Sequence, residues 1–121
     1  MIDIDFFKNV NDTFGHQVGD DVLINLAQIL KKNVRTTDIV GRWGGEEFMI
    51  ISPHTTKKGV FSLAKLIHKK VQEELFNTVG HITISAGVSD IKECQDISNL
   101  IADADKKLYK AKTEGRNRVI K

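Results

Sequence analysis

The sequence has 121 residues, which is room for one domain with a single core. Its hydrophobic fraction of 40%, charged fraction of 28% and formal net charge of +2 are those of an ordinary globular protein and exclude nucleic-acid binding driven by bulk charge. A single cysteine, Cys94, excludes an intrachain disulfide or a Cys-based zinc site. No apolar run is long enough to cross a membrane. We therefore expect a cytoplasmic domain that binds no nucleic acid and makes no membrane contact of its own.

The first part of the chain predicts a short strand followed by a long helix. Residues 1–5 alternate apolar and acidic side chains in the manner of a strand. A short helical turn and a loop closed by Gly15 and Gly19 are expected next, with Asp20 or Asp21 as the cap of the following helix. The apolar residues of that helix recur at spacings of three and four: Val22, Leu23, Leu26, Ala27, Leu30 and Val34.

A hairpin is predicted in the middle of the chain. Two apolar runs, residues 39–43 and 48–51, are joined through Gly44 and Gly45, which are expected to form a two-residue turn. Trp43, directly before the glycines, is expected to pack beneath the hairpin.

The second half predicts two helices that flank one strand. Residues 58–75 form an amphipathic pattern with an apolar stripe made of Val60, Ala64, Ile67, Val71 and Leu75. Residues 81–90 alternate cleanly as a strand, and residues 97–112 form a third helix that Gly115 is placed to end. The inward side of that helix is expected to carry Ile97, Leu100 or Ile101, Ala104, Leu108 and Ala111. Residues 119–120 complete the pattern as a short last strand.

This order of elements predicts an α+β fold. A hairpin inside a β-α-β frame is typical of the ferredoxin-like or palm-type β-α-β-β-α-β sheet, with helices packed on it. In that frame the first strand lies beside the turn of the hairpin, so Asp3 and Asp5 are expected close to Glu46 and Glu47. Carboxylates gathered from two segments are costly without a cation, and hard oxygen ligands suit magnesium. A charged hairpin tip exposed to water is the alternative, and the pattern leaves both interpretations open.

Two basic residues mark the end of the last predicted helix. Lys112 and Arg116 are four positions apart and therefore lie on one side of it. Cations at this end of a helix interact favourably with the helix dipole even without a ligand. A pair directed at a triphosphate would have the same spacing, so position alone does not separate the two interpretations.

Four segments together go beyond these patterns. They are DIDFFKNVNDTFGHQVGDDVL, RWGGEEF, ISAGVS and ADKKLYKAKTEGRNRV. In this order and spacing they resemble the GGDEF domain of diguanylate cyclases over essentially the whole chain, with Glu46 in place of the family's aspartate. The resemblance implies a nucleotidyl-cyclase-like fold and an enzyme that joins two GTP molecules into cyclic di-GMP and pyrophosphate. It also implies a homodimer in which each subunit presents one GTP to the other.

The resemblance also sets expectations for what precedes the chain. The family's opening helix, its D-x-L-T-G-L-x-N-R segment and most of strand one are absent, so we expect a single domain over residues 1–121 that lacks its N-terminal part. An upstream sensor or regulatory domain is expected in the full protein, which an upstream segment could anchor to a membrane.

The resemblance assigns the acidic residues to a metal. Asp3 and Glu46 match the magnesium-binding carboxylates, and the carbonyl of Ile4 matches a backbone ligand. Glu47 matches the second acidic residue of the signature, which is essential and in some accounts also a ligand. Glu46 and Glu47 are thus the implied catalytic residues, and Mg²⁺, or Mn²⁺ in its place, is the implied cofactor.

The resemblance also implies a nucleotide site. Asn11 and Asp20 match the pair that hydrogen-bonds the guanine edge, and Lys112 with Arg116 matches a clamp on the γ-phosphate. The phosphate cradle is implied to consist of the backbone N–H groups of Phe6, Phe7 and Lys8. Gly44 and Gly45 lack side chains, which lets the α-phosphate and ribose approach the hairpin.

The segment RTTD, residues 35–38, matches the family's RxxD inhibitory site for cyclic di-GMP. A guanidinium at Arg35 can take a guanine edge and a phosphate, and Asp38 can accept from guanine N–H groups. An arginine at a helix end and an aspartate in a turn are also ordinary, so the string itself leaves both interpretations open.

Three functions are compatible with these residues. The first is a diguanylate cyclase with product inhibition, and the second is an inactive module that senses GTP or cyclic di-GMP. The third is a palm-type scaffold that binds no nucleotide. The first is favoured because the signature carboxylates and both clamp residues are all present.

Overall fold

The computed structural model describes all 121 residues and contains one five-stranded sheet with strand order β2-β3-β1-β4-β5. Its strands are β1 (Ile2–Ile4), β2 (Ile39–Gly44), β3 (Glu47–Ile51), β4 (Ile84–Gly87) and β5 (Val119–Ile120). β1 occupies the centre and pairs antiparallel with β3 and β4, while β5 runs parallel to β4. The predicted α+β sheet with a central strand beside the hairpin is therefore confirmed.

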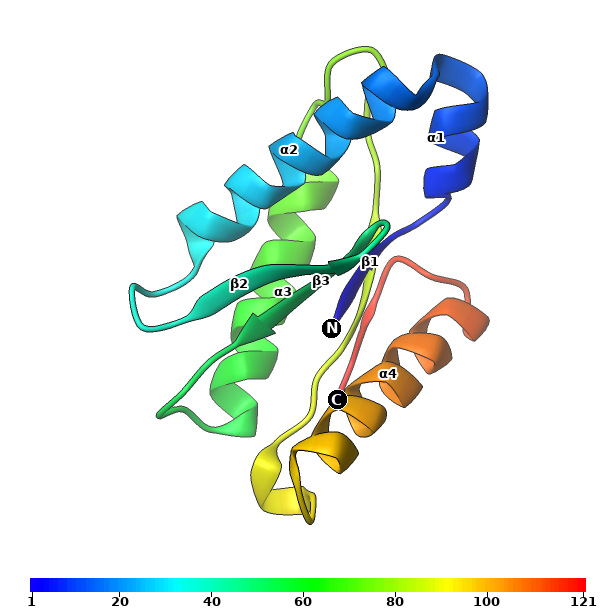
Figure 1. Cartoon of the computed structure of the whole chain (residues 1–121). Coiled ribbons are helices and arrows are strands. Elements are labelled where there is room, and N and C mark those ends of the chain that lie inside the picture. Colours follow the sequence, from blue (N-terminus) through cyan, green and yellow to red (C-terminus); the bar gives the residue numbers. More distant parts are fainter.

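Four helices and one short 3₁₀ turn pack on this sheet. They are α1 (Phe7–Phe14), α2 (His16–Asn33), α3 (Lys57–Glu73), η1 (Ile91–Glu93) and α4 (Ile97–Thr113). Figure 1 shows α2 and α3 together on one side of the sheet, α4 on the other, and α1 directly after β1. None of these helices is both long and apolar enough to span a bilayer.

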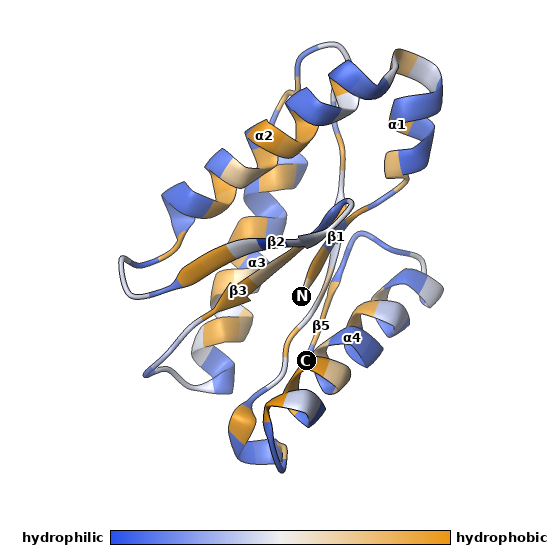
Figure 2. Ribbon diagram, in the orientation of Figure 1, coloured by the Kyte–Doolittle hydropathy of each residue, from blue (hydrophilic) through white to orange (hydrophobic).

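The main core lies between the sheet and the pair α2 and α3. Alternate residues of the central strands, among them Ile4, Phe48 and Ile84, enter this core. They meet the apolar stripes of the two helices, whose members include Leu26 and Ile67. Figure 2 shows these stripes turned toward the sheet and polar residues outward, as amphipathic helices require.

The opposite face of the sheet is covered by α4. Here Ala104 and Leu108 form a smaller cluster with Met1, against which Met49 packs. The backbones of β4 and α4 come so close that a side-chain carbon on Gly87 would collide with the carbonyl oxygen of Ala104. This close approach holds the C-terminal half of α4 against the centre of the sheet.

Two local predictions in the first half of the chain are wrong. α2 begins at His16, so neither Asp20 nor Asp21 caps it, and Gly19 lies inside the helix rather than in a loop. The segment before it is a helix of eight residues, α1, rather than a single turn. Gly15, with φ 89° and ψ 162°, makes the break between the two helices, a conformation that glycine adopts easily.

The hairpin turn is displaced by one residue from its predicted place. β2 ends at Gly44 and β3 begins at Glu47, so the connecting residues are Gly45 and Glu46. The register of the two strands shifts between Arg42 and Gly44, a bulge that the alternation of apolar residues does not reveal.

Three residues predicted to be inside are exposed. Ile97 and Leu75 are 70% and 69% exposed, and Trp43 is 53% exposed on the hairpin. Leu75 lies beyond the end of α3, and Ile97 is the first residue of α4, so neither reaches the packed part of its helix. Apolar spacing overestimates burial at helix ends because it carries no information on where the partner surface stops.

Candidate active site

Carboxylates from two segments meet where β1 lies beside β3. Asp3 is paired with Glu47 in the antiparallel register, so their side chains lie on the same face, the one that α4 covers. Glu46 precedes Glu47 in the turn, and its carbonyl accepts from the N–H of Ile4 at 3.4 Å. The structure thus brings three of the four predicted carboxylates together, those of Asp3, Glu46 and Glu47, with one glutamate in the turn and the other in the strand.

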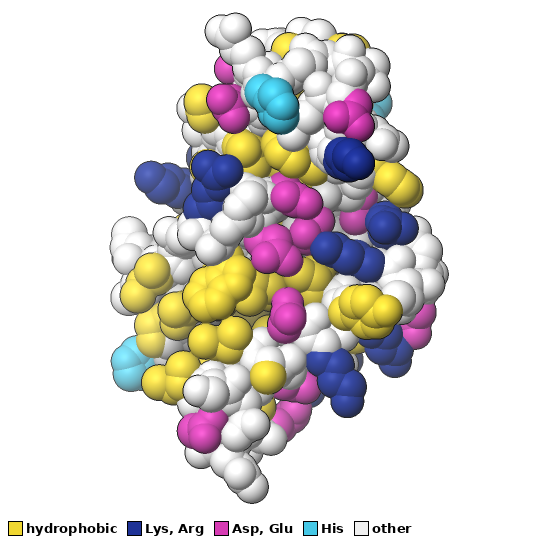
Figure 3. All heavy atoms as spheres, turned by 45° about the vertical axis from the view of Figure 1, so that its right-hand side comes forward, with side chains coloured by type: hydrophobic (Ala, Val, Ile, Leu, Met, Phe, Trp, Pro, Cys, Tyr) yellow, Lys and Arg dark blue, Asp and Glu magenta, His cyan; other side chains and the backbone are white.

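Lys112 of α4 completes this group. Its Nζ donates to Oδ2 of Asp3 at 2.8 Å, and the Asp3 side chain is only 6% exposed. Figure 3 shows acidic side chains at the centre of this face with basic side chains directly beside them. α4 packs closely on β4 at Gly87, and its last turn carries Lys112 to Asp3 of the neighbouring strand β1.

The pKa of Asp3 reflects a carboxylate whose negative charge its surroundings do not fully stabilise. Burial raises the pKa of the Asp3 carboxyl, the Lys112 ammonium lowers it, and the charges of Glu46 and Glu47 raise it again. The net direction is upward, although Lys112 is in direct contact. In this arrangement no three acidic, His or Cys side chains converge as a ligand set. The chemistry of the donors nevertheless fits a hard divalent cation, which would relieve the remaining repulsion.

Asp5 does not join this group, contrary to the sequence prediction. Its Oδ2 accepts from Thr83 Oγ1 at 2.7 Å and from the N–H of Asn117 at 2.9 Å, and its Oδ1 accepts from Ser85 Oγ at 2.7 Å. Asp5 is 5% exposed, and both of its oxygens have partners within the chain. It therefore fastens the end of β1 to β4 and to the loop after α4.

The start of α1 offers free backbone donors beside the carboxylates. Phe6 precedes the helix in the left-handed region with φ 56° and ψ 32°, and supplies no side-chain cap. No acidic residue lies in the first turn, so its N–H groups lack side-chain acceptors. A helix start with these properties can bind a phosphate, and it includes the predicted Phe7 and Lys8.

Arg116 lies across from this helix start. The C-terminus of α4 ends with Gly115 at φ 116° and a bond from the N–H of Arg116 to the carbonyl of Ala111 at 2.9 Å, which is a Schellman cap. The guanidinium of Arg116 then lies 4.8 Å from the centre of the Phe6 ring. The two predicted clamp residues thus occupy different contacts, Lys112 on Asp3 and Arg116 on Phe6.

The two residues of the predicted guanine pair lie on either side of the junction of α1 and α2, Asn11 in α1 and Asp20 in α2. A side-chain carbon on Gly19 would collide with the amide oxygen of Asn11, so the Asn11 side chain lies directly against this part of α2. Asp20, the next residue, is exposed. Gly19 is therefore required at this position for close packing, which the sequence prediction of a loop had missed.

The glycines of the hairpin leave the turn open. No atom lies within 4 Å of the place that a side chain would take on Gly44 or Gly45, and Gly45 has φ 51°. Arg42 braces this turn by donating from Nε to the carbonyl of Gly45 at 2.8 Å.

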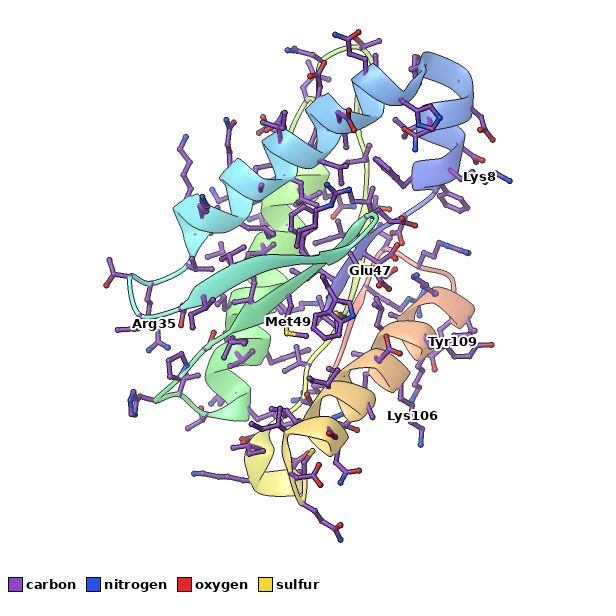
Figure 4. All side chains as sticks on the ribbon, in the orientation of Figure 1. Lys8, Arg35, Glu47, Met49, Lys106 and Tyr109 are labelled. Carbon is purple, nitrogen blue, oxygen red and sulfur yellow. The ribbon has the colours of Figure 1, made fainter.

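Arg35 and Asp38 form a closed unit at the other end of the hairpin, as Figure 4 shows for Arg35 relative to Glu47. Nη2 of Arg35 donates to Oδ1 of Asp38 at 2.9 Å and to the carbonyl of Pro53 at 2.9 Å. The Asp38 side chain is completely covered, and hydrogen bonding from Arg35 lowers its pKa. The Arg35 side chain is 52% exposed and remains accessible.

Three residues near the site were missed by sequence reasoning, namely Thr83, Ser85 and Asn117. A signal was present in the alternation of residues 81–90, which places the hydroxyls of Thr83 and Ser85 on the polar side of the strand. Without the pairing of β4 with β1, nothing connected those hydroxyls to Asp5.

The five-stranded mixed sheet with four helices and its cluster of acidic and basic side chains define a nucleotide-cyclase-like α+β domain. The family model of the diguanylate cyclase GGDEF domain matches residues 1–118. The chain therefore belongs to the GGDEF family of diguanylate cyclases.

Curated relatives agree with this assignment. The chain is 43% identical over 123 residues to diguanylate cyclase A of Treponema denticola, covering 98% of this chain and 33% of that protein. It is 44% identical over 127 residues to the response regulator PleD of Caulobacter vibrioides, covering 99% of this chain and 28% of that protein. The chain thus spans a third or less of the length of these relatives.

Solved structures agree as well. The active GGEEF domain of a diguanylate cyclase from Vibrio cholerae superposes with a TM-score of 0.91 at 42% identity, covering 98% of this chain and 78% of that one. The GGDEF domain of DgcB from Caulobacter crescentus in complex with c-di-GMP superposes with a TM-score of 0.92 at 34% identity, covering 98% of this chain and 72% of that one.

Proposed function

We propose that this chain is the catalytic domain of an enzyme that condenses two GTP molecules into cyclic di-GMP and releases two pyrophosphates. The observation that carries the proposal is the meeting of three elements around the end of β1. They are the carboxylates of Asp3, Glu46 and Glu47, the uncapped start of α1, and the basic end of α4. Acidic oxygens, free N–H groups and basic side chains in one place are what a nucleoside triphosphate with its cation needs.

In this proposal the base of the nucleotide lies between Asn11 and Asp20. The Asp20 carboxylate accepts from guanine N–H groups, and the Asn11 amide donates to a guanine acceptor or accepts from a guanine N–H. The triphosphate accepts hydrogen bonds from the backbone N–H groups that begin at Phe6. Arg116 lies above the ring of Phe6 and is directed at the γ-phosphate. Gly44 and Gly45 leave room for the α-phosphate and ribose at the open hairpin turn.

Asp3, Glu46 and the carbonyl of Ile4 would hold magnesium or manganese, and Glu47 contributes its negative charge beside them. When bound, such an ion lowers the charge on the phosphates and favours ionisation of the attacking hydroxyl. Lys112 would release Asp3 to the cation and turn to the γ-phosphate. Glu46 is better suited to a ligand than to a general base, since a carboxylate on a dication is a weak base.

The reaction is an in-line transfer at phosphorus. The 3′-hydroxyl oxygen of one GTP bonds to the α-phosphorus of the other, the bond to the β-phosphate oxygen breaks, and pyrophosphate leaves; the hydroxyl proton passes to solvent. Since the second bond of the ring needs the reverse attack, two subunits facing each other with one GTP each satisfy the geometry. The similarity to diguanylate cyclase A supports cyclic di-GMP as the product, and the complex of the DgcB domain with c-di-GMP supports binding of this nucleotide by the fold.

Inhibition by the product is assigned to Arg35 and Asp38. The exposed Arg35 guanidinium, held by Asp38 and the carbonyl of Pro53, presents its remaining donors to solvent at a defined place. Cyclic di-GMP supplies the guanine edge and phosphates that such a guanidinium binds.

The test is incubation of the purified protein with GTP and magnesium, followed by mass spectrometry of the nucleotides. Cyclic di-GMP and pyrophosphate in a ratio of one to two are expected. Binding of GTP or cyclic di-GMP without turnover would instead establish the sensor function.

A further inference from the structure

The network around Asp5 connects the two phosphate-binding elements of the proposed site. Asp5 directly precedes Phe6, whose backbone begins the helix start that offers free N–H groups. Through Oδ2 it accepts from the N–H of Asn117 at 2.9 Å, and Asn117 directly follows Arg116. One buried carboxylate thus joins α1 to the loop that carries Arg116.

That loop has a conformation that needs support. Arg116 and Asn117 both have positive φ, 63° and 49°, and neither is glycine. Two successive left-handed residues without glycine persist only where the surroundings hold them. Arg116 is held by the cap bond of its N–H to Ala111 and by Arg118 Nε, which donates to its carbonyl at 2.9 Å. Asn117 is held by the Asp5 carboxylate on its N–H and by His68 Nε2 on its Oδ1 at 2.7 Å.

We propose that Asp5 is a positioning residue for the phosphate clamp: its carboxylate holds the loop after α4 so that Arg116 stays above Phe6, facing the start of α1. Asp5 itself is 5% exposed and uses both oxygens within the chain, so it does not touch the nucleotide. The inference rests on the proposed function only in naming the γ-phosphate as what Arg116 binds.

The first measurement uses the protein without nucleotide. Amide hydrogen exchange of Asn117 is compared in wild type, Asp5→Ala and Ser85→Ala. Ser85→Ala is the matched control because it removes a hydroxyl from Oδ1 of Asp5 and leaves the contact of Oδ2 with Asn117 intact. We expect faster exchange of the Asn117 amide by about 10-fold or more in Asp5→Ala alone, the loss of one charge-assisted hydrogen bond. Unchanged exchange would show that the other contacts of the loop hold it without Asp5 and would overturn the proposal.

The second measurement asks whether Arg116 is the residue affected. Binding of GTP and GDP is compared in Asp5→Ala, Arg116→Ala and the double variant. We expect Asp5→Ala to reduce the preference for GTP over GDP by about 10-fold, and Arg116→Ala to add little to it, because both changes remove the same contact. Asp5→Asn, whose amide oxygen can still accept from Asn117, should recover part of the preference and covers the case in which Asp5→Ala does not fold. Fully additive losses would identify a general loss of stability and overturn the proposal.

A failure of the proposed function is distinguishable from a failure of this inference. A wild-type protein that makes no cyclic di-GMP contradicts the enzyme activity, whereas the exchange of the Asn117 amide still decides whether Asp5 holds the loop.

Discussion

The surroundings at the two ends of the β2–β3 hairpin shift the pKa of a carboxylate in opposite directions. At the turn, burial and two glutamates raise the pKa of Asp3 despite the contact of its carboxylate with Lys112. At the open end, Arg35 lowers the pKa of Asp38 through hydrogen bonds from its side chain and backbone. The turn therefore holds negative charge that a further cation would stabilise, whereas the Arg35–Asp38 unit is already neutralised. The turn is therefore suited to binding a cation, whereas the Arg35–Asp38 pair is a contact that is complete without a ligand.

The largest expected effect comes from Glu46→Gln, which tests the turn end. Loss of a metal-binding carboxylate should lower cyclic di-GMP formation by on the order of 10²–10³-fold, the equivalent of several kcal/mol. Stability should not fall, because the change removes a charge that repels Asp3. Rates measured by product formation and melting by circular dichroism check both parts, with Glu73→Gln on the exposed side of α3 as control. Wild-type turnover in Glu46→Gln would contradict the assigned role.

The open end is tested by Arg35→Ala. Cyclic di-GMP should inhibit this variant about 10- to 100-fold less strongly, since a charged hydrogen-bond donor to the ligand is lost. Turnover without added product should stay near that of wild type, because the site at the turn lies at the other end of the hairpin. Initial rates against added cyclic di-GMP give the inhibition constant. Lys32→Ala, also at the end of α2, is the control, and unchanged inhibition in Arg35→Ala would remove the assignment.

A third variant, Lys112→Met, tests how much the stability of the folded carboxylate cluster depends on a nearby positive charge. Asp3 would lose its one cation while 6% exposed, so the free energy of unfolding should fall by about 1–3 kcal/mol without metal. Magnesium without nucleotide should raise the melting temperature more in this variant than in wild type. Lys110→Met, which affects only a more exposed ion pair with Glu114, should change little. No gain from magnesium in Lys112→Met would count against a cation at Asp3.

The smallest effect is a difference in pH dependence. The folded pKa of Asp3 lies above the unfolded value of about 3.9, so its contribution to stability is present below pH ~4 and lost as pH rises through the folded pKa. The folded pKa of Asp38 is lowered, so its contribution is present above pH ~4 and lost as pH falls. Relative to wild type, Asp3→Asn should therefore gain stability between pH 3 and 7, and Asp38→Asn should lose it. Urea unfolding across this range measures both, and slopes of equal sign would refute the comparison.

Much of the fold could be predicted from local patterns. The stripes of α2, α3 and α4 and the alternation of residues 81–90 reflect one buried face each, and the bounds of α3, α4 and the strands were predicted within a few residues, whereas α1 and the start of α2 were not. The wrong predictions concern positions whose structure depends on contacts with another element of the fold. Gly19 lies inside α2 with the Asn11 side chain directly against it, and Trp43 lies on the edge strand β2, most of which is exposed.

The sequence by itself determined which residue types were available: the acidic pair after the glycines, the basic pair near the C-terminus and the RxxD string. Only the tertiary structure decided what each does, and Asp3 and Asp5 show why. They are two positions apart, Asp3 within β1 and Asp5 directly after it, and have the same chemistry. Asp5 accepts hydrogen bonds from residues 80 and 112 positions away and has a structural role. Asp3 instead lies beside two carboxylates and one lysine. The state of a carboxylate depends on the charges and donors around it, and those come from parts of the chain that only folding brings near.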